Sequence, residues 1–173
     1  KRHAELAVKD EYMCDCMELA PEHSERELEQ ALIYHIQKFL SEMGGMFAFI
    51  GNQYKIVVNG DEFFIDLLLY HRKLRSMVAI ELKIGKFDPA DVGQLQFYLT
   101  ALDEQEKLPE ENSSIGIIIC RSKNRTVVEY ALKSATVPMG VATYKISNEL
   151  PEEMKKRLPG PEEIARRLEE IDG

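Results

Sequence analysis

Apolar side chains recur every three or four positions between residues 28 and 43, which is the spacing of one buried helix face. The positions are Leu28, Leu32, His35, Ile36, Phe39, Leu40 and Met43. Ser24 precedes Glu27 by three residues, the spacing of a capping box at a helix N-terminus. Gly44 and Gly45 follow as a stop signal. We therefore predict one helix that begins near Ser24 and ends before Gly44.

Two segments rich in β-branched and aromatic residues flank Asn59-Gly60, namely Gln53 to Val58 and Glu62 to Tyr70. Asn-Gly between such segments is the strongest short hairpin signal, because the two residues accept positive φ angles. A polar turn follows, and Ser76 to Ile84 is predicted as a third strand. The segment Phe63 to Leu69 is apolar except for Asp66, which indicates a strand covered on both faces.

The second half of the chain alternates helical and strand patterns. Asp88-Pro89 predicts a helix start, with Asp as N-cap and Pro at the first position. Its buried stripe would be formed by Val92, Leu95, Leu99 and Leu102. An acidic loop is expected next. Then come a buried strand over Ile115–Cys120, a helix around Thr126–Ser134 and a strand near Gly140–Ile146.

The predicted order is α-β-β-β-α-β-α-β. A hairpin that leads into a β-α-β unit implies an α/β fold, a mixed central sheet flanked by helices on both faces. Residues 1–22 lack clean periodicity and are predicted as a lead-in segment, residues 23–150 as the main domain, and residues 151–173 as a C-terminal helical tail.

Length and composition restrict the class of protein. A chain of 173 residues with 45% hydrophobic residues fits one domain with a sizeable core, and excludes disorder as the main state. No apolar run approaches the roughly 18 residues of a membrane span, and no signal peptide opens the chain. We therefore expect no membrane association. Three cysteines are too few for a disulfide scaffold, so we expect free thiols in a reducing cytoplasm.

The net charge of −8 argues against a surface coated with cations for nucleic acid. The charge is nevertheless uneven, because both ends are acidic and residues 31–148 hold thirteen acids and thirteen bases. The bases of this middle part form short clusters that permit a local cationic groove. They are Arg72, Lys73, Arg75, Lys83, Lys86, Arg121, Lys123 and Arg125.

Three ionisable residues occur within apolar strand sequences. Asp66 lies in Phe-Phe-Ile-Asp-Leu-Leu-Leu, and the next strand carries Glu81-Leu-Lys83. A buried carboxylate costs several kcal/mol unless it is paired or binds a metal. Strand periodicity places Glu81 and Lys83 on one face, roughly 7 Å apart. The intervening turn brings Asp66 close to Glu81.

These residue types suit a divalent metal site. Asp66 and Glu81 supply the hard oxygen ligands that Mg²⁺ or Mn²⁺ prefers, and the carbonyl of Leu82 would add another. Lys83 would then orient a water molecule or neutralise transition-state charge. An alternative is a buried ion pair of Lys83 with Asp66 or Glu81 that only stabilises the sheet. The spacing alone leaves both interpretations open.

Several stretches together resemble the YhcG-like bacterial proteins with a C-terminal PD-(D/E)XK nuclease domain, of the restriction-endonuclease-like superfamily. The resemblance covers about residues 5–165, although Ile65 precedes Asp66 where the superfamily's motif has proline. The matching stretches are 28–32, Phe47-Ala-Phe-Ile-Gly-Asn-Gln53-Tyr54, Phe64-Ile-Asp66-Leu-Leu, Ala79-Ile-Glu81-Leu-Lys83, Gly93-Gln94-Leu-Gln96-Phe-Tyr98-Leu, 114–120 and 128–132.

The resemblance implies further site residues. Glu29 matches an acid that such nucleases often direct at the metal, although sequence alone favours an exposed surface position. Gln94 and Tyr98 match the Gln-x-x-x-Tyr signature of RecB-type nucleases, and their i,i+4 spacing places them on one helix face. Gln94 would hold a nucleotide or order Lys83, and Tyr98 would contact a phosphate. Gln53 is a weaker candidate on the adjoining strand.

The primary hypothesis is a divalent-metal-dependent nuclease that hydrolyses phosphodiester bonds in DNA. Asp66, Glu81, Leu82 and Glu29 would hold the metal, and Lys83 would assist the attacking water. The resemblance also implies a separate N-terminal domain of the full-length protein as a source of DNA affinity. One alternative is a catalytically silent nuclease fold for nucleic-acid binding or protein assembly. Another is a structural domain that forms a homo-oligomer through residues 151–171.

Overall fold

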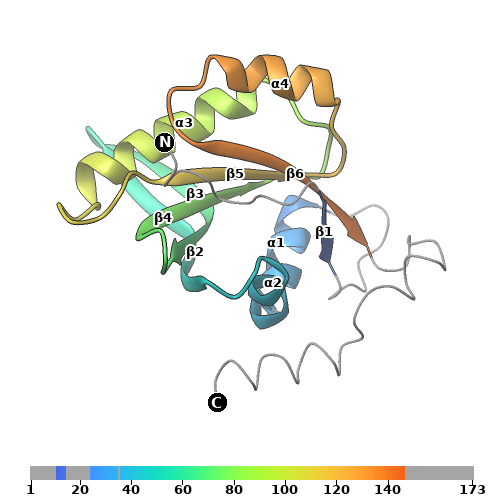
Figure 1. Ribbon diagram of the computed structural model, residues 1–173, viewed down its shortest axis with the longest axis horizontal. Helices are drawn as coiled ribbons and strands as arrows, with labels where there is room; N and C mark the ends of the chain where they lie inside the picture. The colour runs from blue at the N-terminus through green and yellow to red at the C-terminus, as the bar shows by residue number, and fades with distance from the viewer. Residues whose placement is uncertain (1–10, 15–23, 35, 147–173) are drawn as a thin grey trace.

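The computed structural model describes residues 11–14, 24–34 and 36–146, which form six strands and four helices (Figure 1). The helices are α1 (Glu25–Tyr34), α2 (Ile36–Glu42), α3 (Ala90–Gln105) and α4 (Arg125–Lys133). The strands are β1 (Glu11–Cys14), β2 (Phe47–Val58), β3 (Asp61–His71), β4 (Ser76–Leu82), β5 (Ile115–Cys120) and β6 (Met139–Ile146).

All six strands belong to one mixed sheet in the order β1-β6-β5-β4-β3-β2. Strands β2, β3 and β4 form an antiparallel meander, whereas β4, β5, β6 and β1 run parallel. Asn59 and Gly60 join β2 to β3 with φ angles of 50° and 90°, as a type I′ hairpin turn requires. The predicted hairpin, the mixed sheet and its α/β class are confirmed.

Helices cover both faces of the sheet, as predicted (Figure 1). Leu28, Leu32 and Phe39 of α1 and α2 pack with Tyr144 and alternate residues of β3, β4 and β5 on one face. Residues of α3 and α4, among them Leu95, pack on the other face. Every residue of β4 and β5 is buried, because these central strands lie between two helical layers.

Three elements differ from the sequence prediction. The lead-in segment contains β1, which pairs with β6 in parallel, so the predicted order lacked a first strand. The helix predicted from Ser24 to Gly44 is two helices, α1 and α2. Strand β2 begins at Phe47, six residues before the predicted start, and contains a bulge between Phe49 and Gly51. The predicted helical tail lies outside the described residues.

Local capping explains where α1 and α3 begin. Ser24 and Glu27 exchange hydrogen bonds, with Glu27 N donating to Ser24 Oγ at 3.1 Å and Ser24 N to Glu27 Oε1 at 2.7 Å. Helix α3 begins at Ala90, after Pro89 rather than Asp88 in the N-cap position. Asp88 still caps the helix through its side chain, because Oδ1 accepts from Ala90 N at 2.8 Å.

The acidic segment predicted as a loop is partly helical, because α3 continues to Gln105. Asp103 lies in this last turn and accepts hydrogen bonds from the backbone N–H and the hydroxyl of Ser114. The helix end is thereby tied to the residue that precedes β5. Across the described ranges, 11–14, 24–34 and 36–146, none of the helices has the length and apolarity needed to cross a membrane.

Candidate active site

Asp66 occupies the place where β3 separates from β4. The last paired residues of the two strands are Leu67 and Ile80. Beyond this pair, Asp66 Oδ2 accepts a hydrogen bond from the backbone N–H of Leu82 at 2.8 Å. Beyond the last paired residues, a side-chain carboxylate therefore takes the place of a backbone carbonyl as the acceptor for the N–H of the neighbouring strand. The substitution holds Asp66 beside Glu81, the residue before Leu82.

The side-chain alternation of β3 also changes at Asp66. Ile65 packs in the core under α3 together with Leu68. Leu67 and Leu69 pack in the core under α1 and α2. In a regular strand, Ile65 and Leu67 would share a face. The backbone irregularity thus lies at the acidic residue itself, where it places the carboxylate between the two layers.

Glu81 is a buried acid with an unsatisfied oxygen. The residue is only 6% exposed, and its Oε2 has no hydrogen-bond partner among the described residues. Burial, and next the charge of Asp66, raise the pKa of Glu81 to about 9, although the charge of Lys83 opposes the rise. An acid in this state holds its proton near neutral pH unless a cation replaces the proton.

Gln53 connects Asp66 to the first helix. Its neighbours Asn52 and Tyr54 pair with Leu67 and Ile65, so Gln53 lies opposite Asp66 in the register. Its Nε2 donates to Asp66 Oδ1 at 3.0 Å and to Glu29 Oε2 at 2.6 Å. One side-chain amide therefore links carboxylates from β3 and α1.

The backbone of Gln53 is left-handed, with a φ of 46°, an uncommon conformation for a residue other than glycine. Such a conformation persists only where the surrounding structure enforces it. Here two carboxylates accept from the side-chain amide. From the sequence, Gln53 is a weaker candidate than Gln94, yet in the structure its amide donates directly to both acids.

Glu29 points toward the site, as the resemblance implied and against the expectation of an exposed surface position. It is 6% exposed on α1, next to the buried Leu28. Burial raises the pKa of Glu29, the charge of Asp66 adds to the rise, and the bond from Gln53 and the charge of Arg26 oppose it. Its carboxylate reaches Asp66 through Gln53.

Lys83 follows β4 and pairs with an acid that the sequence analysis missed. Its Nζ lies 3.5 Å from Asp91 Oδ1 in the first turn of α3. The described residues contain no ion pair of Lys83 with Asp66 or Glu81, which was the structural alternative. Asp91 stands three residues after Asp88, the spacing of a reciprocal cap, but nothing in the sequence places it beside Lys83.

Gln94 and Tyr98 share a face of α3, as their spacing predicts. Gln94 Nε2 donates to the hydroxyl oxygen of Tyr98 at 3.2 Å. Tyr98 is 6% exposed, so it is less accessible than a surface phosphate contact would require. Burial and then the charges of Glu81 and Asp66 raise the pKa of Tyr98, whereas the bond from Gln94 lowers it. Tyr98 thus lies within electrostatic range of both acids.

The acids fit a divalent cation in chemistry, although no group of three His, Cys, Asp or Glu side chains within residues 11–14, 24–34 and 36–146 is arranged to hold a metal ion. The unsatisfied Oε2 of Glu81 and its position beside Asp66 favour a positive charge at this point. Glu29 is bonded to Gln53. The carbonyl of Leu82 remains a predicted ligand.

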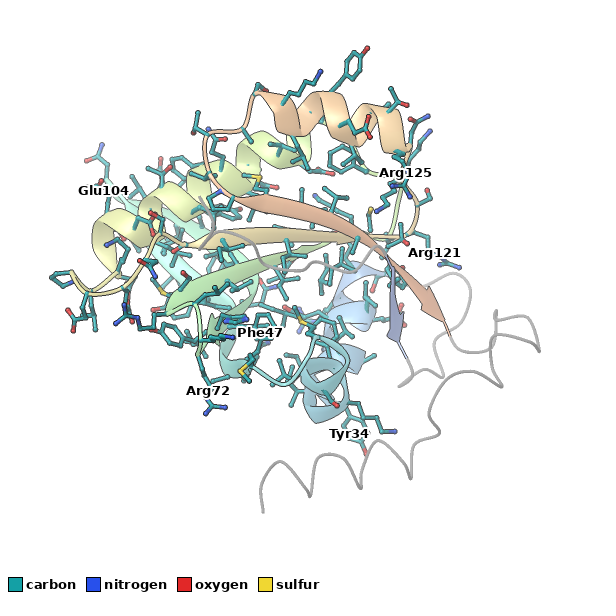
Figure 2. All side chains as sticks on the ribbon, in the orientation of Figure 1. Tyr34, Phe47, Arg72, Glu104, Arg121 and Arg125 are labelled. Atoms are coloured by element: carbon teal, nitrogen blue, oxygen red, sulfur yellow. The ribbon has the colours of Figure 1, made fainter. Side chains whose placement is uncertain are left out.

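The basic residues divide between two ends of the sheet (Figure 2). Arg72, Lys73 and Arg75 form the turn before β4, about 20 Å of strand from Glu81. This turn lies against the acidic segment, since Asn112 N donates to the carbonyl of Arg75. Burial and the charges of Glu111 and Glu110 raise the pKa of Tyr70 beside this turn, and the charge of Arg75 opposes the rise. The turn therefore does not extend the site into a cationic groove.

Lys86 and Arg121 lie at the same end of the sheet as the acids. Lys86 forms a parallel bridge with Ser122, and Arg121 N donates to Gly85 O. Figure 2 shows Arg121 and Arg125 together where β5 leads into α4, and Arg72 on a separate turn. The guanidinium of Arg121 lies 5.7 Å from the centre of the Tyr144 ring. Cationic side chains therefore border the carboxyl ends of β4 and β5.

A mixed sheet with an acid on a hairpin strand, Glu-x-Lys on the next strand and helices on both faces defines the restriction-endonuclease-like class. Two solved structures share this fold. One is a repair endonuclease from Pyrococcus abyssi, with a TM-score of 0.50 and 21% sequence identity; the match covers 70% of this chain and 47% of that chain. The other is EndoMS in complex with dsDNA, with a TM-score of 0.52 and 19% sequence identity; the match covers 75% of this chain and 47% of that chain.

Within this class, the chain belongs to the YhcG PDDEXK nuclease domain family, whose model matches residues 5–159. It is 38% identical over 149 residues to the protein of Escherichia coli (strain K12) named "Putative nuclease YhcG". The alignment covers 86% of this chain and 39% of that protein, so the chain spans less than half of its relative. The family resemblance expected from the sequence is confirmed.

Proposed function

We propose that this domain is a divalent-metal-dependent nuclease that hydrolyses phosphodiester bonds in DNA. The observation that carries the proposal is the pair of acids at the end of β4. Asp66 is held beside Glu81 by the Leu82 N–H, and Glu81 Oε2 is buried without a hydrogen-bond partner among the described residues. Membership in a nuclease domain family supports the same conclusion.

Asp66 and Glu81 would hold the cation, Mg²⁺ or Mn²⁺, with the carbonyl of Leu82 as a further ligand. When bound, the cation would polarise a phosphoryl oxygen and acidify a water molecule. Glu29 would add negative charge near the cation while it is bonded to Gln53. It would become a metal ligand if that hydrogen bond opened.

Lys83 would orient the attacking water or stabilise charge on the phosphate, because its ammonium lies on the same side of the strand as Glu81. Gln94 would hold the Tyr98 hydroxyl in place beside the acids. Tyr98 would exclude water from the apolar side of the site, since it is buried on the face of α3 that packs on the sheet.

DNA is the proposed substrate. Lys86 and Arg121 border the end of the sheet that carries the acids, where they would contact backbone phosphates. The fold is shared with EndoMS, which has been solved with dsDNA. The net charge of −8 limits nonspecific attraction, so an additional domain of the full-length protein would supply part of the DNA affinity.

The test is a cleavage assay on a panel of duplex, branched and single-stranded DNA with Mg²⁺ or Mn²⁺, comparing the parent with Asp66→Asn, Glu81→Gln and Lys83→Ala. We expect metal-dependent cleavage by the parent and loss of at least about a hundredfold in each variant. Equal cleavage by Lys83→Ala and the parent would contradict the role of the lysine.

A thermal-shift titration with Mn²⁺ addresses the cation separately. The parent should gain thermal stability on binding the cation, and Asp66→Asn should gain less. Salt-dependent DNA binding without cleavage under any divalent metal would instead identify a binding module, the alternative function of this fold.

A further inference from the structure

Asp91 is placed to hold the ammonium of Lys83. Its Oδ1 lies 3.5 Å from Lys83 Nζ, and its Oδ2 accepts from the backbone N–H of Asp88 at 3.1 Å. The side chains of Lys83 and Asp91 are 28% and 13% exposed. One oxygen is thus fixed by the helix cap, and the other faces the lysine in a partly buried setting where charges are screened less than at the surface.

The charges around the site show what this contact changes. Lys83 and Glu81 are two residues apart at the end of β4, a spacing that places both side chains on one face of the strand. Among the described residues, the contacts of the Asp91 carboxylate are with the Lys83 ammonium and the backbone N–H of Asp88. Asp91 therefore affects the acid pair through Lys83 rather than directly. Without Asp91, the ammonium would be free to turn toward Glu81, which lies on the same face of the strand.

A lysine that turned toward Glu81 would occupy the position where the proposed cation needs a free carboxylate. An ammonium and a divalent cation compete for the same negative charge, so a salt bridge between Lys83 and Glu81 would weaken cation binding. The Lys83–Asp91 pair prevents this competition, because the ammonium is attracted to α3 instead.

We propose that Asp91 is a positioning residue that holds the Lys83 ammonium on the α3 side of the site and leaves the Asp66–Glu81 pair available to the cation. The part of this proposal that concerns cation binding rests on the proposed function. The placement of the lysine, however, can be measured on the protein without metal or DNA.

The first experiment follows the Lys83 ammonium by ¹H–¹⁵N NMR of lysine side chains in the metal-free protein. Asp91→Asn is the matched variant, because the amide oxygen still accepts from Asp88 N while the charge is lost. We expect a restrained Lys83 ammonium in the parent and a clear loss of order in Asp91→Asn. An unchanged Lys83 signal would overturn the proposal.

A control is available in the hairpin. Lys55 and Glu62 form an ion pair of similar length, 3.4 Å, but their side chains are 52% and 54% exposed. Glu62→Gln removes a comparable charge far from the acids in the sheet. The Lys83 ammonium should keep its order in Glu62→Gln. If its order changed as much as in Asp91→Asn, the effect would come from a general loss of negative charge, and the proposal would be overturned.

The second experiment measures Mn²⁺ affinity by calorimetry in the parent, Asp91→Asn, Lys83→Met and the double variant. Asp91→Asn should weaken Mn²⁺ binding about threefold to tenfold when Lys83 is present and less than about twofold in the Lys83→Met background. Equal weakening in both backgrounds would mean that Asp91 acts by its own charge, which overturns the proposal.

The two experiments separate this inference from the proposed function. If the parent binds no Mn²⁺ and cleaves no DNA, the proposed function fails. The NMR comparison then still decides whether Asp91 positions Lys83. If the parent binds Mn²⁺ and the lysine order does not depend on Asp91, the proposed function stands and this inference fails.

Discussion

Asp66 accepts a hydrogen bond of 2.8 Å from the backbone N–H of Leu82, and this contact joins the two strands that carry the acids beyond their last paired residues. Strands β3 and β4 no longer pair beyond Leu67 and Ile80, so the carboxylate completes the ladder. Asp66 therefore has a structural role as well as its proposed chemical one. The two roles can be separated by substitution.

We predict that Asp66→Ala is about 1–3 kcal/mol less stable than the parent, and that Asp66→Asn, which keeps one of the two acceptor oxygens, loses less stability. The asparagine keeps an oxygen acceptor for the N–H of Leu82, a residue 1% exposed, and the alanine leaves that donor without a partner. Both variants should lose cleavage. Urea denaturation of the three proteins measures the difference, and equal stability of the two variants would contradict the structural role.

Glu81 should make the stability of the fold depend on pH. Its pKa is about 9 in the folded chain and near the ordinary value of 4.5 in the unfolded chain. Between these values the unfolded chain has released the proton and the folded chain has kept it. The free energy of unfolding therefore falls as pH rises from about 5 to 9, with a slope of up to about 1.4 kcal/mol per pH unit from this group.

Glu81→Gln tests this dependence, because glutamine mimics the protonated acid at every pH. The variant should match the parent near pH 5 and exceed it in stability at pH 8, while it loses cleavage. Urea denaturation at pH 5, 6.5 and 8 gives the comparison. Parallel pH profiles for the two proteins would show that Glu81 is not proton-linked to folding.

Gln53 combines a strained backbone with a side-chain amide that donates to two acids. Glycine at this position would relieve the left-handed φ of 46°, whereas alanine would keep the strain, and both would remove the amide. We predict that Gln53→Gly is about 1 kcal/mol more stable than Gln53→Ala. Both should cleave DNA about tenfold more slowly or worse, because Glu29 and Asp66 lose their common donor.

The two Gln53 variants are compared by denaturation and by the DNA cleavage assay. Greater stability of Gln53→Ala would show that the backbone at this position is not strained. Full activity of both variants would show that the amide does not position the acids.

Gly116 lets α3 approach the sheet. A Cβ on Gly116 would lie 2.7 Å from Leu95 Cδ2 and 2.9 Å from Leu99 Cδ1, and both leucines are fully buried. We predict that Gly116→Ala destabilises the fold by about 1–3 kcal/mol through overpacking. Gly93→Ala is the matched control within α3, where a Cβ would meet nothing within 4 Å.

The control should be stabilised by about 0.5–1 kcal/mol, since alanine is the better helix former. Thermal or urea denaturation of both variants measures the two changes, which have opposite signs. A neutral Gly116→Ala would indicate that α3 can shift away from β5 at no cost.

Much of the fold was predictable because its signals are local. The spacing of Val92, Leu95, Leu99 and Leu102 is that of a buried helix face, and each is buried in α3. Asn59-Gly60 specifies its turn through the φ angles it tolerates. Ile115–Cys120 is continuously apolar because the strand is covered on both sides. Each of these features depends on residues that are neighbours in the chain.

Elements whose stability comes from distant partners were missed. Strand β1 has four residues and no periodicity of its own, and it is a strand because β6 offers a parallel edge. The early start of β2 depends on pairing of Phe47 with His71. The sequence shows neither partner, because pairing between remote segments leaves no local pattern.

For the site, the sequence determined which residues are the candidates for the chemistry. Asp66, Glu81 and Lys83 are ionisable residues in otherwise apolar strands, and their burial cost identifies them without any coordinates. Only the tertiary structure decided how they are arranged. It joins Glu29 to Asp66 through Gln53, pairs Lys83 with Asp91, and leaves Glu81 Oε2 without a hydrogen-bond partner in the described part of the chain. The reason is physical: hydrophobic periodicity selects the buried face of each element, but hydrogen bonds and charges act over a few ångströms between elements that the chain brings together only on folding.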